Sequence, residues 1–305
     1  MLIAIDHGNK AVKVSRRAFS AGLNESGTRP PFGEDVLHYN GVYYTTSDQR
    51  IPYLPDKTID RRFFVLTLFA IAYELEAAGT YTPGTVIDVQ LAVGLPPSHY
   101  GRLYKIFEAY FRSNHTEDFM FRGKPYSVRI SEVIAYPQAY AAAMTIFSSI
   151  KDASKVIVLD IGGWTADYIQ IKSGKHDLSV CDSLENGVIH LYNRVRSKVS
   201  SESDFLLDES DIDAILLGKN TEYPNTVCQI VGTAAQSFVN DLFATMRERM
   251  IDLKTGKTVF VGGGSMLLKR QILNSDKVGA PLFVEDISAN AKGYELLYRA
   301  QQLRR

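Results

Sequence analysis

The chain has 305 residues, of which 34 are basic and 34 are acidic, so its formal net charge is zero. A zero net charge argues against a dedicated nucleic-acid-binding protein, which usually carries a basic excess, and against a disordered acidic protein. The apolar fraction of 45% is ordinary for a globular chain with a substantial core. The length predicts one large or two medium-sized domains.

The cysteines and the apolar segments indicate an intracellular protein. Cys181 and Cys228 are too few for a disulfide scaffold and form no CxxC pair, so a reducing compartment is expected. The first residues are apolar but reach Asp6 at once and lack a basic leader region. The longest apolar run, residues 63–73, is well short of the roughly 20 residues that a membrane-spanning helix needs. We therefore expect a cytoplasmic protein that does not contact a membrane.

The first half of the chain alternates short strands with helices. In chain order, the expected elements are strands 2–6 and 11–17, a loop at 23–34, a hairpin at 36–46, a helix at 59–78, a strand at 86–93, a helix from the Pro96-Pro97 pair to residue 112, a hairpin formed by 119–121 and 126–130, and a helix at 137–150. Asn40-Gly41 predicts a type I′ turn in the first hairpin, and Gly123-Lys124 is expected to form the turn of the second. Pro137 is expected to open its helix, because proline is well tolerated at a first helical position.

The pattern starts again after residue 151. The expected elements are strands 155–160, 164–172 and 176–183, helices 185–199, 209–217 and 227–250, a strand at 258–261, and a last helix at 288–303. The unit strand-Asp6-x-Gly8-turn-strand recurs as strand-Asp160-x-Gly162-turn-strand, about half the chain later. Such a repeat predicts two similar α/β domains that face one another.

The first candidate site is Asp6-His7-Gly8-Asn9-Lys10, which is followed three residues later by Lys13. A glycine turn permits positive φ and a close approach of the backbone to a ligand, and successive backbone N–H groups can bind an anion. Lys13 is expected to point back toward the same anion, and Asp6 to hold a hydrated Mg²⁺. His7 is expected to be a loop residue whose side chain points outward. The alternative is a plain β-turn between strands.

The second candidate site, residues 158–167, repeats this logic with Gly162, Gly163 and Thr165. Asp160 is expected to be the second carboxylate on the metal side, and Asp167 to order the loop. The alternative is an ordinary glycine hairpin.

Two further stretches are candidates. A buried strand runs into Gly262-Gly263-Gly264-Ser265, where bare backbone at the start of a helix can accommodate a nucleotide; the alternative is a flexible turn. Gln138 is expected in the first turn of the helix at 137–150, where a glutamine can orient an attacking water; the alternative is an exposed first-turn residue. No Walker-type loop, GxGxxG, HExxH or GxSxG motif is present.

Along the chain the four motifs are Asp6-x-Gly8 with Lys13, Pro137-Gln138, Asp160-x-Gly162-Gly163-x-Thr165 and Gly262–Ser265. In that order they resemble the phosphate-1, connect-1, phosphate-2 and adenosine motifs of the actin/Hsp70/sugar-kinase superfamily. Within it the chain looks most like the ParM/StbA group of bacterial actin-like proteins. Residues 93–96 after a strand, the Asn40-Gly41 hairpin and residues 289–294 at the start of the last helix support that group.

The resemblance implies an α/β actin-like fold in which two ribonuclease-H-like domains flank a nucleotide cleft. Domain I would comprise residues 1–150 and 286–305, and domain II residues 151–285. The last helix would return to the first domain.

The resemblance also implies a role for each motif residue. The phosphates would be contacted on one side by Gly8, Asn9 and Lys13, and on the other by Gly162, Gly163 and Thr165. Mg²⁺ would be held through water by Asp6 and Asp160, and the hydrolytic water would be positioned by Gln138. The adenosine side would be formed by Gly187, Gly263, Gly264 and Ser265. Gln138 stands where many bacterial members carry Glu, which implies slow hydrolysis.

The function that the resemblance implies is an Mg²⁺-dependent ATPase that assembles into dynamic filaments and segregates plasmid DNA. The motifs do not distinguish ATP from GTP, nor a plasmid cargo from a phage genome or a chromosome. The partners would be other copies of the chain and a DNA-binding adaptor, with no direct contact to nucleic acid. A small-molecule kinase and a nucleotide switch that does not polymerise are the alternatives.

Overall fold

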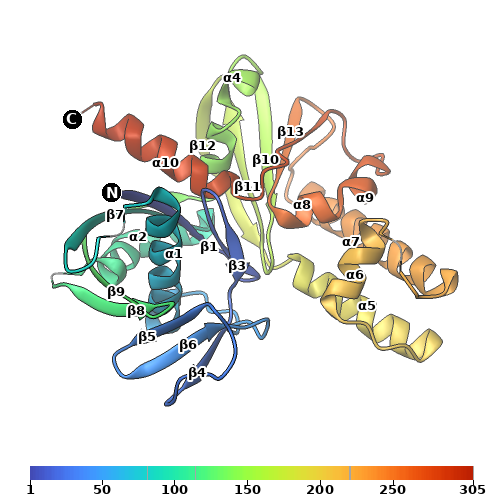
Figure 1. Ribbon diagram of the computed structural model, residues 1–305. Coiled ribbons are helices and arrows are strands. Elements are labelled where there is room, and N and C mark those ends of the chain that lie inside the picture. Colours follow the sequence, from blue (N-terminus) through green and yellow to red (C-terminus); the bar gives the residue numbers. More distant parts are fainter. Residues whose placement is uncertain (81, 114, 220, 305) are drawn as a thin grey trace. The chain divides into compact units, whose positions relative to one another are not determined.

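The computed structural model describes residues 1–80, 82–113, 115–219 and 221–304. The chain divides into two compact units, Met1–Thr145 with Ser288–Arg305, and Ile146–Ile287. Figure 1 shows that each unit combines a sheet with helices, and that the last helix, drawn in red, belongs with the N-terminal part of the chain. Within the described ranges, no helix is both long enough and apolar enough to cross a membrane.

The first unit contains a nine-stranded sheet in the order β3-β2-β1-β7-β9-β8-β5-β6-β4. Its strands are β1 (Leu2–His7), β2 (Ala11–Val14), β3 (Ala18–Ser20), β4 (Leu23–Ser26), β5 (Val36–Tyr39), β6 (Val42–Thr46), β7 (Val86–Leu95), β8 (Glu117–Phe121) and β9 (Lys124–Pro137). Strand β1 pairs antiparallel with β2 and parallel with β7, and β7 pairs parallel with β9. The carboxyl ends of β1, β7 and β9 therefore lie at one edge of the sheet.

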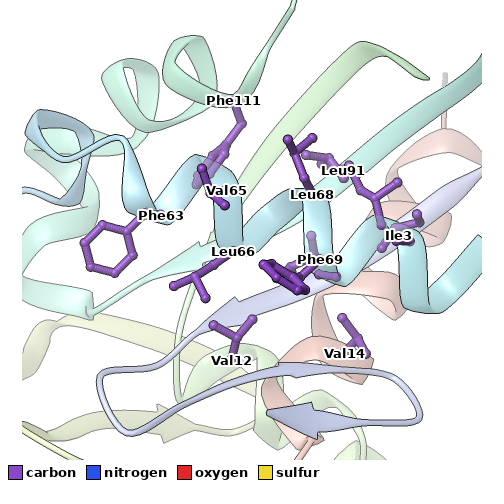
Figure 2. Close-up of a cluster of buried hydrophobic side chains, with 14 of the residues drawn as sticks. Ile3, Val12, Val14, Phe63, Val65, Leu66, Leu68, Phe69, Leu91 and Phe111 are labelled. Atoms are coloured by element: carbon purple, nitrogen blue, oxygen red, sulfur yellow. The ribbon is translucent and has the colours of Figure 1, made fainter. Parts of the chain in front are cut away.

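Alternate residues of β1 face opposite sides of this sheet. Ile3 and Ile5 belong to the main core, which also contains the apolar face of helix α1 (Arg62–Ala78) and residues of α2 (Pro97–Phe111). Figure 2 shows Ile3 near Leu68 and Leu91, and the side chains of α1 above Val12 and Val14 of β2. Ala4 belongs instead to a second cluster with residues of α3 (Tyr140–Met144) and α10 (Ala289–Gln302).

The second unit contains a five-stranded sheet in the order β12-β11-β10-β13-β14. Its elements are β10 (Lys155–Ile161), β11 (Ala166–Lys172), β12 (Lys175–Leu184), β13 (Lys257–Val261) and β14 (Pro281–Phe283), with helices α4 (Phe147–Ile150), α5 (Val188–Ser203), α6 (Glu209–Leu216), α7 (Asn225–Glu248), α8 (Gly263–Leu267) and α9 (Lys269–Leu273). Strand β10 pairs antiparallel with β11 and parallel with β13, as β1 does with β2 and β7. Ile157, Leu159 and Ile161 face the core of this unit. The two units thus repeat one arrangement, as the sequence predicts.

The structure corrects several expected elements. Residues 23–34 are not entirely loop, because Leu23–Ser26 forms the edge strand β4 against β6. The expected strand 11–17 ends at Val14, and Ala18–Ser20 forms another strand. Asn40 and Gly41 both have positive φ, 49° and 78°, which confirms the type I′ turn.

Three other boundaries differ from those expected. Arg122 and Gly123, rather than Gly123-Lys124, form the second hairpin turn, with φ of 52° and 75°. No continuous helix runs over 137–150, because β9 extends to Pro137 alongside β7. Helix α5 begins at Val188, three residues later than expected.

Candidate functional site

Asp6 lies near the end of β1, where the structure gathers charged and polar side chains. It is paired across the sheet with Lys13 of β2, and the Lys13 ammonium lies 3.4 Å from Asp6 Oδ2. Only 2% of Asp6 is exposed. The antiparallel register therefore places the Lys13 ammonium beside the Asp6 carboxylate.

Gln138 joins this pair from the end of β9. Its Nε2 donates a hydrogen bond of 2.9 Å to Asp6 Oδ1, and its backbone N–H donates to the Leu95 carbonyl at the end of β7. The expectation that Gln138 lies in the first turn of a helix was wrong, and at 9% exposure the alternative of an exposed residue is wrong as well. The reason is that strand pairing with β7 continues as far as Pro137 opposite Leu95.

The turn between β1 and β2 contains Gly8 and Asn9, both half-buried. A Cβ atom at Gly8 would lie 2.5 Å from the Ala11 carbonyl oxygen. Gly8 is not among the residues with positive φ, so the turn requires glycine because the chain folds closely on itself.

His7 is a buried residue of β1, and the expectation of an outward loop side chain was wrong. It is 1% exposed, stacks on Phe111 with ring centroids 4.8 Å apart, and places Nε2 2.8 Å from Thr67 Oγ1. Burial, followed by the positive charge of Lys57, lowers the pKa of His7 from 6.5 to about 3. The imidazole is therefore neutral at physiological pH and attaches the turn to helices α1 and α2.

In the second unit, Asp160 occupies the position on β10 that Asp6 occupies on β1. It is 5% exposed and is paired across the sheet with Asp167 of β11. The connecting loop closes through a hydrogen bond of 2.8 Å from the Gly162 N–H to the Thr165 carbonyl. Thr165 Oγ1 donates to Asp167 Oδ2 at 3.2 Å. Asp167 thus orders the loop, as expected.

Gly187 lies against this same loop, at the N-terminus of α5. The N–H groups of Gly187, Val188 and Ile189 donate to the carbonyls of Trp164, Gly162 and Gly163. A Cβ atom at Gly187 would lie 2.4 Å from the Gly163 oxygen. The structure therefore groups Gly187 with the Gly162–Thr165 loop, whereas the resemblance placed it with the adenosine side.

The three glycines after β13 have three different environments. Gly262 has φ of 86°, and a Cβ atom there would lie 2.1 Å from Asp160 Oδ1. A Cβ atom at Gly264 would lie 2.6 Å from the Ile161 carbonyl, whereas one at Gly263 would meet nothing within 4 Å. Gly263 opens the short helix α8, so only Gly262 lies in the turn itself.

The hydroxyl of Ser265, the next residue, is buried without a hydrogen-bond partner. A buried polar atom without a partner is unfavourable unless a ligand supplies one. Asp160, the open backbone at Gly263 and the Ser265 hydroxyl are thus compatible with a polar ligand.

Asp6 in the first unit and Asp160 in the second are each a chemically suitable ligand for a hydrated Mg²⁺, which takes one or two protein carboxylates and keeps several waters. Among the described residues, no group of three or more His, Cys, Asp or Glu forms a metal site. Asp6 and Asp160 each lie at the end of a central strand, beside a glycine turn.

The sequence pattern missed two residues whose side chains bond to the backbone next to Asp6 and next to Gln138. Lys57, before α1, donates a hydrogen bond from Nζ to the His7 carbonyl, and no local signal indicated it. Asn290 of α10 accepts a hydrogen bond of 3.1 Å from the Ala139 N–H, directly after Gln138. The resemblance includes residues 289–294 but implies no role for Asn290.

Comparisons with known proteins agree with this arrangement. A family model described as actin-like proteins, N-terminal domain, matches residues 4–140, and one described as archaeal actin homologue MreB-like, C-terminal, matches residues 158–274. Compared with curated protein sequences, the chain has no significant match.

Solved structures of actin homologues share the fold. Ta0583, an archaeal actin homologue, is 18% identical with a TM-score of 0.77, over 98% of this chain and 99% of that one, and it has also been solved in complex with ADP. The Alp12 filament structure is 16% identical with a TM-score of 0.68, over 99% and 98%. ParM of Bacillus thuringiensis with ATP is 11% identical with a TM-score of 0.67, over 99% of each chain.

The expected actin-like fold is confirmed over nearly the whole chain, because the structural matches cover both units. The chain therefore has the actin-like fold, and it is similar to ParM, to Alp12 and to archaeal actin homologues.

Proposed function

We propose that this protein is an Mg²⁺-dependent ATPase that assembles into filaments. The observation that carries the proposal is the convergence of Lys13 and Gln138 on the buried Asp6 carboxylate. A lysine, a carboxylate and a neutral amide gathered at the carboxyl end of β1 are the groups that phosphate binding, metal binding and water orientation require.

We propose that the motif residues bind the nucleotide as the resemblance implies, with one change at Gly187. The β- and γ-phosphates are bound by Gly8, Asn9 and Lys13 of the first unit and by Gly162, Gly163 and Thr165 of the second. The adenosine is bound by Gly263, Gly264 and Ser265. We move Gly187 from the adenosine side to the second phosphate loop, because its backbone supports that loop.

Asp6 and Asp160 would hold Mg²⁺ through water, and the metal would supply charge neutralisation of the phosphates. Gln138 orients the attacking water, because an amide can both donate and accept a hydrogen bond. Its hydrogen bond to Asp6 Oδ1 fixes the position of its NH₂ group and leaves its carbonyl oxygen to accept from that water. Since an amide is a poor proton acceptor, Gln138 positions the water without removing its proton, and turnover is expected to be slow.

The proposal extends from ATP hydrolysis to filament formation and DNA segregation. The Alp12 relative was solved as a filament, and structures with this fold contain ADP or ATP. We propose that ATP favours assembly, that hydrolysis weakens contacts between subunits, and that the filaments segregate plasmid DNA in the cytoplasm. Because the net charge is zero, DNA contact would be made by an adaptor protein.

Two other functions differ in what they require. A small-molecule kinase needs a carboxylate that accepts the proton of its substrate hydroxyl, and the neutral amide of Gln138 beside Asp6 disfavours that chemistry. A nucleotide switch would bind ATP with the same residues but would remain monomeric.

Sedimentation of the purified chain with Mg-ATP, with Mg-ADP and without nucleotide distinguishes the filament-forming ATPase from the switch. A pellet of filaments that depends on Mg-ATP, together with phosphate release, supports the proposal. Nucleotide binding without a pellet at any protein concentration supports the switch.

A further inference from the structure

The backbone directly after Gln138 forms an unusual tight turn. Ala139 has φ of 60° and ψ of −53°, and the Tyr140 N–H donates a 2.6 Å hydrogen bond to the Gln138 carbonyl. This is the γ-turn with positive φ at its central residue, which is rare and strained. Residues other than glycine seldom adopt such a conformation, so surrounding contacts must maintain it at Ala139.

Neighbouring groups satisfy the backbone of this turn. The Gln138 N–H donates to the Leu95 carbonyl, and the Ala139 carbonyl accepts from the Ala143 N–H. The Ala139 N–H donates to a side chain, the Oδ1 atom of Asn290, at 3.1 Å. Because Ala139 is completely buried, its N–H would be left without an equivalent partner if that side chain were removed.

Helix α10 is built to bring Asn290 to this position. Residues 290, 293 and 294 lie on one face of the helix. A Cβ atom at Gly293 would lie 1.9 Å from the Ala141 carbonyl, so the missing side chain lets α10 approach the backbone of α3. Tyr294 packs where Gly94 of β7 leaves space, since a Cβ atom at Gly94 would lie 2.0 Å from the Tyr294 hydroxyl oxygen.

We propose that Asn290 is a positioning residue for ATP hydrolysis. Its hydrogen bond to the Ala139 N–H holds the γ-turn closed, and the closed turn keeps the Gln138 side chain on Asp6. This inference rests on the proposed function for its catalytic consequence, but the structural link between Asn290 and Gln138 can be tested separately.

The kinetic test compares Asn290→Ala with Gln301→Ala. Gln301 is also on α10 and also accepts a hydrogen bond from β9, but that bond comes from the Tyr136 hydroxyl, at 3.0 Å, and not from the backbone of the turn. We expect Asn290→Ala to lower kcat for phosphate release at least tenfold with KM changed less than threefold, and Gln301→Ala to leave both near wild type. An Asn290→Ala enzyme with unchanged kcat, or with a loss confined to KM, would overturn the proposal.

Two combinations separate positioning from a general loss of stability. Adding Asn290→Ala to Gln138→Ala should lower kcat no further, because both changes remove the same aligned group. Adding Ala139→Gly to Asn290→Ala should restore part of kcat, because glycine adopts positive φ without the steric penalty. If Asn290→Ala alone does not fold, it is compared with wild-type Asn290 in the Ala139→Gly background; a kcat that remains lower with Asn290→Ala supports the proposal, and equal kcat values contradict it.

A crystal structure of Asn290→Ala decides the matter without any activity measurement. We expect the γ-turn to open and Gln138 Nε2 to leave Asp6 Oδ1. An unchanged turn, with that hydrogen bond intact, would refute the role of Asn290. If instead the turn opens but the wild-type protein hydrolyses no ATP, the proposed function fails and the structural link between Asn290 and Gln138 stands.

Discussion

Gln138 and Asp6 are 132 positions apart in the chain, yet Gln138 Nε2 donates a hydrogen bond of 2.9 Å to Asp6 Oδ1 in the buried end of the first sheet. The contact arises because β1 and β9 both run parallel to β7 and end at the same edge. The group proposed to orient water is thereby fixed to the group proposed to hold the metal.

Removing the amide should separate binding from hydrolysis. We expect Gln138→Ala to bind ATP and assemble as the wild type does, while phosphate release slows roughly 100-fold, a typical effect of a positioned group at the reacting centre. Single-turnover phosphate release measures this directly. Gln170→Ala, which truncates another buried glutamine bonded to a carboxylate, Asp177, is the matched control and should hydrolyse normally. Unchanged turnover in Gln138→Ala would remove this residue from the mechanism.

The carboxylate of the second unit should control Mg²⁺-dependent nucleotide binding. We expect Asp160→Ala and Asp160→Asn to weaken ATP binding in the presence of Mg²⁺ by about 10- to 100-fold, as loss of a group that orders a metal site typically does. The asparagine variant keeps the side-chain shape that packs against Gly262, so its loss of affinity cannot be attributed to packing. Titration with a fluorescent ATP analogue, with Mg²⁺ and with EDTA, gives the comparison. Tight Mg-ATP binding by Asp160→Asn would show that the assignment of this loop is wrong.

Two adjacent glycines should respond differently to the same substitution. Gly262→Ala is expected to destabilise the fold by about 1–3 kcal/mol or more, because Gly262 has positive φ and a Cβ atom would collide with Asp160 Oδ1. Gly263→Ala should leave thermal stability nearly unchanged, because its Cβ atom would meet open space. If the nucleotide lies against Gly263, this second variant should nevertheless bind ATP more weakly. Thermal unfolding and ATP titration of both variants test the assignment, and normal ATP affinity in Gly263→Ala would exclude that residue from the site.

His7 should make stability depend on pH below neutrality. Its pKa is lowered to about 3 in the folded state, so between pH 6.5 and 3 the unfolded chain binds the proton more strongly and stability falls as the pH falls. From pH 7 to pH 5 the loss attributable to His7 is about 2 kcal/mol. Denaturant unfolding of wild type and His7→Gln at both pH values isolates it, because the other titrating groups are shared. His38→Gln, on β5, is the control. An equal pH dependence in wild type and His7→Gln would contradict the burial of the neutral ring.

The organisation into two similar units could be predicted from the sequence because the same motif occurs twice along the chain. The recurrence of Asp6-x-Gly8 as Asp160-x-Gly162 reflects two sheets with the same local strand order, in which the neighbouring Ile5 and Leu159 face the cores and the acids face the other side. The burial of His7 was also accessible in principle. His7 shares the parity of Ile3 and Ile5, so a strand one residue longer places its side chain in the core.

The environment of Gln138 could not be derived locally. Pro137 is a plausible start of a helix, but pairing of β9 with β7 continues to Pro137 and determines the local conformation. The positive φ of Ala139 and its contact with Asn290 depend on packing of α10 against α3, over a sequence separation of 151 residues. Tertiary contacts of this kind leave no periodic signal in the segment that they reshape.

The central claim is that ATP binding and hydrolysis govern assembly of this chain. Right-angle light scattering on addition of Mg-ATP, with phosphate release followed in the same sample and the scattering material imaged by electron microscopy, tests it most directly. We predict that scattering rises only above a critical protein concentration, that filaments are visible at the plateau, and that scattering decays as phosphate appears. Phosphate release or nucleotide binding without any rise in scattering, at every concentration tested, would contradict the claim and favour a monomeric switch or a kinase.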